Sequence, residues 1–225
     1  MKLNLKERLQ SLKMVAGLAT FLKNPGSLDS VFAVAASLKD SPLGEQMVQH
    51  LLTDHQFRSL VDEGWRPAPI NLDQLQQLPE GSLGRVYADQ LIRQGITPDT
   101  LIDPSPVTNP REFVVHRLKE THDIVHVLTG CGIDGVSELG LQGCNLAQNR
   151  SPLAVMLIFG GLLSALQNND SLAPLLRALA HGFQMGLVAD LVSARKLEDG
   201  GGRRLLEWRR DLKLPSAPGE DSQQS

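Results

Sequence analysis

Hydrophobic positions along most of the chain recur every three or four residues, the spacing that places them on one side of an α-helix. Residues 3–23 carry such a stripe of leucine and alanine, with basic residues elsewhere around the helix. Residues 153–166 are apolar almost throughout, which is typical of a buried helix. The sustained polar and apolar alternation that marks strands does not occur. The pattern therefore predicts an all-α fold built as a single helical domain.

Glycine and proline divide this pattern into separate elements, because both residues favour helix ends and turns. Gly182 and Gly186 lie four residues apart inside one expected helix, and we expect them to mark close packing against another helix rather than a ligand. The expected helices cover residues 3–23, 29–38, 42–62, 72–78, 83–94, 112–130, a stretch from about 134, 153–166, 171–197 and a short basic segment after Gly200-Gly201-Gly202.

The chain has three expected regions. We predict an N-terminal amphipathic helix over residues 1–26, a helical domain over 27–213 and a disordered tail over 214–225, which is polar and contains proline. The longest uncharged stretch, residues 151–169, includes Gly160-Gly161 and ends in polar residues. Its apolar part is shorter than the roughly twenty residues of a membrane span. We expect a buried helix there, and no secretory signal at the N-terminus.

Composition excludes some classes of function. The net charge of −3 and the lack of a basic run interleaved with aromatic residues argue against nucleic acid as a partner. Aromatic residues make up only 4% of the chain, so the expected core is aliphatic. The two cysteines, Cys131 and Cys144, are too few for a disulfide framework and fit a reducing compartment. We expect a cytoplasmic protein.

Metal-binding side chains converge at a meaningful spacing in the stretch from Thr121 to His126. His122 and His126 are four residues apart, so both imidazoles lie on one face of a helix. Asp123 lies on the flank of that face, where its carboxylate would ligate an ion or orient the second imidazole. Two imidazoles favour Zn, Fe or Mn over Mg or Ca. We expect a divalent ion, with Zn the first choice and Fe, Mn or Mg as alternatives.

Glu138 is the fourth candidate ligand. It comes twelve residues after His126, which on one continuous helix would separate the two by roughly 18 Å. Glycines between them predict a helix ending near Gly130, a tight turn and a second helix starting near Asp134 that carries Glu138 back. A metal ion would then join two helices through His122, Asp123, His126 and Glu138. The alternative is two histidines packed at a helix interface, each hydrogen-bonded to a carboxylate.

The order His122-Asp123-x-x-His126, eleven residues and then Glu138 resembles the HDxxH-x11-E motif of the coenzyme Q (ubiquinone) biosynthesis protein 4 family. The match is complete in residue type and spacing. Leu78–Ala88, with the sequence LPEGSLGRVYA, resembles a second recurring segment of that family.

The resemblance covers most of residues 30–210 and implies a role in quinone biosynthesis. It implies a polyprenyl lipid or prenylated quinone precursor as ligand, so that the apolar helices form a lipid groove beside the metal. It further implies a homodimer attached peripherally to a membrane surface, with other quinone-biosynthesis proteins as partners.

Three functional hypotheses follow, two from the resemblance and a third from the His-Asp pair itself. The first is a metal-dependent lyase or oxidoreductase that removes the C1 carboxylate oxidatively from a prenylated hydroxybenzoate, with catalytic residues unassigned. The second is a non-catalytic, lipid-binding scaffold that organises a biosynthetic complex. The third is a metal-dependent phosphohydrolase. That third class needs a separate upstream histidine, and His116 lies only six residues before His122 on the same expected helix and on another face.

Overall fold

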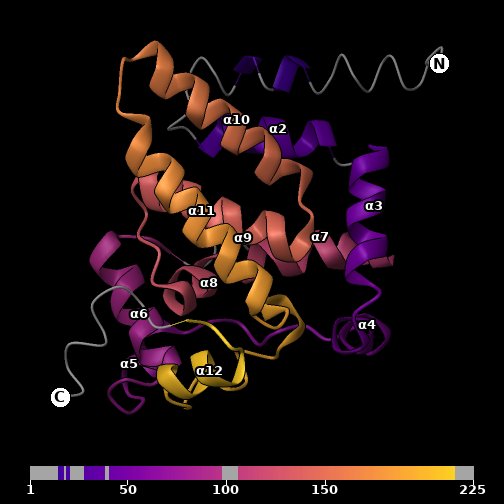
Figure 1. Cartoon of the computed structure of the whole chain (residues 1–225). Helices are drawn as coiled ribbons and strands as arrows, with labels where there is room; N and C mark the ends of the chain where they lie inside the picture. Colours follow the sequence, from indigo (N-terminus) through magenta and orange to yellow (C-terminus); the bar gives the residue numbers. More distant parts are fainter. Residues whose placement is uncertain (1–14, 18, 21–27, 39–40, 98–105, 216–225) are drawn as a thin grey trace. The chain divides into compact units, whose positions relative to one another are not determined.

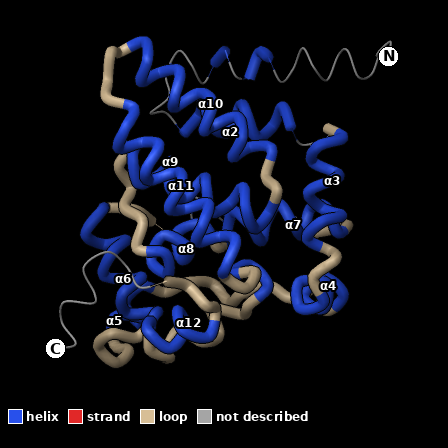
Figure 2. The backbone as a smooth tube through the Cα atoms, in the orientation of Figure 1, coloured by secondary structure: helices blue, strands red, loops and turns tan. Residues whose placement is uncertain are grey.

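The computed structural model describes residues 15–17, 19–20, 28–38, 41–97 and 106–215. Within these ranges the secondary structure is helical, apart from one isolated antiparallel bridge between Ser82 and Arg204 (Figures 1 and 2). The prediction of an all-α fold is confirmed.

The chain gathers into two compact units, each assembled from two separate stretches. Unit 1 comprises residues 1–50 and 132–187, and unit 2 comprises residues 51–131 and 188–225. The chain therefore passes repeatedly from one unit to the other. Composition along the sequence gives no sign of this interleaving, because both units are aliphatic and helical.

Unit 1 is a set of helices around an aliphatic core. Helix α10 packs against both α9 and α2. Val34 and Leu38 of α2 are buried with Leu157 of α10, and Leu153 and Met156 pack against this cluster. Apart from the last residues of α3 and α11, the helices of unit 1 are α2 (Leu28–Leu38), α3 (Pro42–Leu51), α9 (Gly135–Asn149), α10 (Pro152–Gln167) and α11 (Leu172–Val188).

Glycines allow α11 to approach α9 at backbone distance. A Cβ atom added to Gly182 would lie 1.8 Å from the carbonyl oxygen of Gly140, and one added to Gly186 would lie 2.7 Å from that of Cys144. No larger residue fits at the first position without moving a helix. The helix-packing interpretation of Gly182 and Gly186 agrees with this geometry.

Unit 2 is organised around α8, which contacts α6, α7 and α12. The segment after α11 joins α6 through backbone hydrogen bonds: the amide of Leu83 donates to the carbonyl of Arg203, and that of Gly84 to the carbonyl of Gly201, each at 2.8 Å. The elements of unit 2 are α4 (His55–Asp62), α5 (Leu72–Gln76), α6 (Leu83–Gln94), α7 (Pro110–Glu120), α8 (His122–Thr129), the 3-10 turn η2 (Val192–Ala194) and α12 (Leu205–Asp211).

Two expected helices are shorter than predicted. The prediction of one continuous helix over 42–62 was wrong. Asp54 caps a new helix there by accepting a hydrogen bond from the amide of Phe57 at 2.9 Å. The helix expected to reach residue 197 ends at Val188. Beyond it, the amide of Asp190 donates to the carbonyl of Leu212 at 2.9 Å instead of continuing the helix.

The predictions at the two ends of the chain fall largely outside the described residues. Residues 15–17 and 19–20 of the expected N-terminal helix are helical, and the remainder of residues 1–26 is not described. Of the expected tail, only Leu214 and Pro215 are described. No helix in the described ranges is long and apolar enough to cross a membrane.

Candidate functional site

The helix that carries the two histidines is separate from the one before it. We expected one helix over 112–130, but α7 ends at Glu120 and α8 begins at His122. Thr121 joins them with φ −86° and ψ −7°, and its hydroxyl donates to the carbonyl of Arg117 at 2.7 Å. The expectation of a continuous helix was wrong, because Thr121 lies between the two helices as a turn residue.

The two imidazoles of α8 lie together. The Nε2 atoms of His122 and His126 are 3.2 Å apart, and the ring centroids are 4.7 Å apart with nearly perpendicular planes. His126 is buried and His122 is half-buried. A tetrahedral zinc ion with bonds of about 2.0–2.1 Å holds two nitrogens about 3.3 Å apart. The pair therefore has the separation that one ion requires, and it equally allows a hydrogen bond between the rings.

A backbone carbonyl orients the second imidazole. Gly130 ends α8 in the left-handed conformation, with φ 72°, and turns the chain so that the Cys131 carbonyl lies 3.1 Å from Nδ1 of His126. A carbonyl oxygen only accepts, so Nδ1 carries the proton and donates. The other nitrogen, Nε2, then keeps its lone pair for a metal or a donor. Cys131 thus contributes to this site through its backbone carbonyl.

Asp123 lies one position further round α8 and is half-buried. Its charge reaches Tyr87 of α6. The pKa of that phenol is raised above its ordinary value, first by burial and then by the negative charges of Asp123 and Glu198. The structure thus brings the two imidazoles together, with the Asp123 carboxylate close enough to Tyr87 for its charge to be felt there. Its role as a metal ligand stays a prediction.

Glu138 lies on α9, in unit 1. That helix starts at Gly135, as the sequence predicted, because the Asp134 carboxylate accepts hydrogen bonds from the amides of Val136 and Ser137. The Glu138 carboxylate accepts a hydrogen bond of 2.7 Å from the side chain of Gln142. The histidines belong to unit 2 and Glu138 to unit 1, so its role as a ligand also stays a prediction.

Sequence reasoning missed a buried arginine on α7. Arg117 is 1% exposed, and its guanidinium donates to the Glu198 carboxylate at 2.6 Å and to the backbone carbonyls of Ser193 and Arg195. Its guanidinium carbon lies 4.9 Å from the centre of the Trp65 ring. Its hydrogen-bond partners are about eighty residues away in sequence, so no local pattern indicates them. The interaction joins α7 to the segment that follows η2.

His116, the histidine that a phosphohydrolase would need, has another partner. Arg66 donates to Nδ1 of His116 at 3.1 Å and forms an ion pair with Glu120. Burial raises the pKa of the Glu120 carboxyl, although Arg66 acts in the opposite direction. His116 thus belongs to a buried network on α7, which gives no support to the phosphohydrolase hypothesis.

Comparison with known proteins identifies the family of this chain. A family model described as Coenzyme Q (ubiquinone) biosynthesis protein Coq4 matches residues 1–214. The chain belongs to the Coq4 family. The resemblance stated from the two sequence segments is confirmed, and it extends over more of the chain than residues 30–210.

A solved structure shares the Coq4 fold of this chain. It comes from Nostoc punctiforme PCC 73102 and is described as a candidate ubiquinone biosynthesis protein. The TM-score is 0.83 at 28% sequence identity, and the match covers 92% of this chain and 99% of the other.

Curated relatives include fungal proteins named as mitochondrial Coq4 proteins of ubiquinone biosynthesis. The Clavispora lusitaniae protein is 30% identical over 56% of this chain and 40% of its own length. The Penicillium rubens protein is 28% identical over 61% of this chain and 50% of its own length. The chain thus spans about half or less of these two relatives. The Schizosaccharomyces japonicus protein is 26% identical over 93% of this chain and 89% of its own length.

Proposed function

We propose that this chain acts in ubiquinone or related prenylquinone biosynthesis by holding a prenylated quinone precursor close to a divalent metal ion. The proposed ligands are His122, Asp123, His126 and Glu138. The observation that carries the proposal is the 3.2 Å separation of the two Nε2 atoms, combined with the Cys131 carbonyl that keeps the proton of His126 on Nδ1. Zn is our first choice of ion, with Fe, Mn or Mg as alternatives.

The proposed chemistry is oxidative removal of the C1 carboxylate from a prenylated hydroxybenzoate: the carboxylate leaves as CO2, a hydroxyl group takes its place on the ring, and dioxygen is the oxidant that accepts the two electrons. A bound divalent ion supplies positive charge that polarises an oxygen of the substrate or of a bound water. His126 contributes a fixed ring orientation, since its Nδ1 proton is held by a backbone carbonyl. Carboxylates from Asp123 and Glu138 would offset the charge of the ion.

Exposed apolar stripes on two helices of unit 1 support a lipid or membrane ligand. On α10, Val155, Phe159 and Leu166 are exposed and lie within about 40° of one another around the helix. On α11, the exposed residues Leu176, Phe183 and Leu187 form a similar stripe. Large apolar side chains are costly to leave in water, so such stripes are suited to a polyprenyl chain, a membrane surface or a second copy of the chain in a homodimer.

The same stripes favour the alternative function, a non-catalytic scaffold. Lipid binding by α10 and α11 needs no chemistry at the histidine pair. In that case the metal would have a structural role, and other quinone-biosynthesis proteins would be the partners that the scaffold organises. Turnover by protein that carries the metal separates the two functions.

The first experiment measures metal by elemental mass spectrometry on protein purified without chelators. We expect about one divalent ion per chain in the wild type and in His181→Ala, a control at an exposed histidine of α11. His126→Ala and Glu138→Gln should lose most of that metal. Full metal content in His126→Ala would reject the site. Metal without turnover of a prenylated hydroxybenzoate would favour the scaffold.

A further inference from the structure

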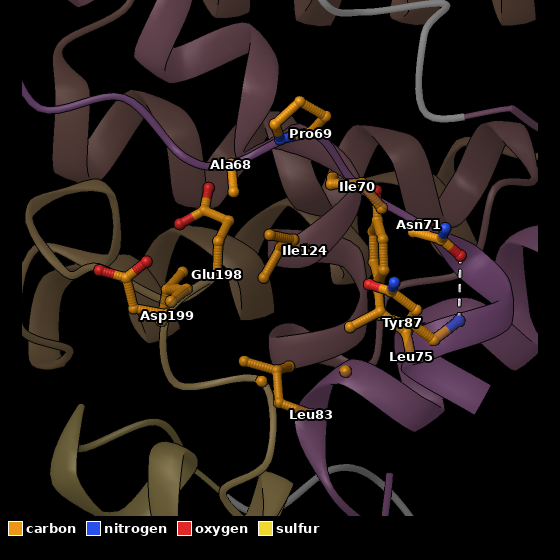
Figure 3. Close-up of a pocket in the computed structure, with 14 residues that line it drawn as sticks. Ala68, Pro69, Ile70, Asn71, Leu75, Leu83, Tyr87, Ile124, Glu198 and Asp199 are labelled. Atoms are coloured by element: carbon orange, nitrogen blue, oxygen red, sulfur yellow. Dashed lines mark hydrogen bonds between the residues drawn. The ribbon is translucent and has the colours of Figure 1, made fainter. Parts of the chain in front are cut away.

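Unit 2 contains a pocket that the proposed metal site does not use. It has a volume of about 140 Å³ and is lined by the loop before α5, by α5 and α6, by one residue of α8 and by the segment after η2. Figure 3 shows Glu198 and Asp199 on one side, Tyr87, Asn71 and Leu75 on the other, and Ile124 between them.

The pocket and the histidine pair lie on different sides of α8. Ile124, the residue of α8 that lines the pocket, is two positions from both His122 and His126. Two positions correspond to about 200° of rotation around a helix. Ile124 therefore points away from the imidazoles, and a ligand of the pocket would not be a ligand of the metal.

Glu198 gives this pocket an unsatisfied hydrogen-bond acceptor, which a simple gap in the packing would lack. Its side chain is 8% exposed, and one carboxylate oxygen accepts the hydrogen bond from Arg117 at 2.6 Å. The other oxygen, Oε2, is buried without a hydrogen-bond partner. An unsatisfied buried acceptor is costly, and a charged one more so. This oxygen is closed off from the cavity as well, so a ligand's donor reaches it only when the Glu198 carboxylate rotates toward the pocket, and the hydrogen bond then removes that cost.

The charges around the pocket limit the ligand's own charge. Glu198, Asp199 and the nearby Asp123 are acidic. The pKa of Tyr87 is raised first by burial and then by the negative charges of Asp123 and Glu198. An anionic ligand would be repelled. A cationic group is not required, because Arg117 already balances Glu198.

The size and the lining of the pocket limit the body of the ligand. Leucine and isoleucine side chains form much of the wall, which suits an apolar group. An apolar protein cavity of about 150 Å³ takes up benzene, so the volume here matches a single six-membered ring.

We propose that this pocket binds a small neutral molecule built on one hydroxylated ring, a phenol, whose hydroxyl donates a hydrogen bond to the Glu198 carboxylate. The ring lies against Ile124 and Leu83, and Tyr87 closes the far side. This site is independent of the metal and of the proposed function, because none of the proposed metal ligands lines it.

Methyl NMR with labelled isoleucine and leucine tests the proposal, with phenol, benzene, benzoate and benzylammonium as probes. Phenol should shift the methyl signals of Ile124 and Leu83 in a saturable way. Benzene lacks the donor and benzoate carries the wrong charge, so each should bind about tenfold more weakly than phenol. Benzylammonium should bind no more tightly than phenol, because Arg117 already balances the charge of Glu198. Benzoate binding as tightly as phenol, or benzylammonium binding more tightly, would overturn the neutral class.

Two variants test the residues themselves. Ala68→Trp places a large side chain in the pocket wall and should lower the phenol affinity at least tenfold. Glu198→Gln should bring the phenol and benzene affinities within about threefold of each other. Glu207→Gln, a partly exposed acid on α12, is the control and should bind phenol as the wild type does. Unchanged phenol binding in Ala68→Trp would refute the site, even if Glu198→Gln fails to fold.

Discussion

At the scale of single residues, the ion pair between Arg117 and Glu198 shows two properties that a local sequence pattern does not indicate: burial of a charged side chain and a partner far away in sequence. The identity of an arginine at position 117 suggests a solvent-exposed helix surface, yet the side chain is enclosed by the segment after η2. The motif histidines were predictable because they are close in sequence and share a helix face. The partners of Arg117 were not, because only the folded chain brings them together.

Replacing Arg117 by methionine should destabilise unit 2 strongly. The change leaves the Glu198 carboxylate buried without its cation, and removal of one partner of a buried pair costs about 3–5 kcal/mol. Denaturant unfolding followed by circular dichroism measures this loss in the free energy of unfolding. Arg210→Met, at a side chain that is 77% exposed, is the matched control and should change stability by less than about 0.5 kcal/mol. Equal effects in the two variants would contradict the structural role of Arg117.

A pH-dependent contribution is expected from Asp190. Hydrogen bonds and charge from Lys213, followed by Arg195, hold the pKa of its carboxyl below the ordinary value of 3.8. A group whose pKa is depressed on folding stabilises the fold above its unfolded pKa, and the contribution disappears as pH falls through the folded pKa. Asp190→Asn should therefore lower stability at pH 7 by no more than about 1 kcal/mol.

The difference between wild type and Asp190→Asn should shrink as the pH is lowered below 3.8. Thermal unfolding at pH 7 and at about pH 3 measures it. Asp62→Asn, at an exposed position, provides the control and should show no such convergence. A difference that grows on acidification would contradict the sign of the shift.

At the scale of elements, sequence was reliable where a local signal defines both ends. Helix α6 covers Leu83–Gln94 as expected, because Gly95 ends it in the left-handed conformation with φ 66°. The breaks before Asp54 and at Thr121 were missed, since aspartate and threonine inside an apolar period do not by themselves interrupt it. At Asp54 a side-chain hydrogen bond to the first turn of the new helix marks the break, whereas α8 begins without a side-chain cap.

The crossing of α9 and α11 yields a sharp prediction about glycine. Gly182→Ala should destabilise the protein by about 1–3 kcal/mol or more, because the new methyl group would overlap the Gly140 carbonyl and separate the helices. Gly135→Ala, where nothing lies within 4 Å of the added carbon, is the control. It should be neutral or slightly stabilising through the unfolded chain. Chemical denaturation compares the two.

At the scale of the whole molecule, the apolar stripes on α10 and α11 lead to a prediction about membranes. Phe159→Glu together with Leu187→Glu should reduce co-sedimentation with anionic phospholipid vesicles by about tenfold or more, since each residue contributes about 1.5–3 kcal/mol when buried. Ile92→Glu, at an exposed apolar position on α6, should have little effect. An equal loss in that control would show that added charge alone explains the result.

The interleaving of the two units has a consequence for biosynthesis on the ribosome. All residues of unit 1 have been translated once Leu187 is made, whereas unit 2 still lacks everything beyond that point. Until Glu198 emerges, Arg117 has no carboxylate partner and the pocket lacks one of its walls. A nascent chain stalled near residue 190, or a frameshift there, would therefore leave the histidine helix translated within an incomplete unit, exposed to chaperones and proteases.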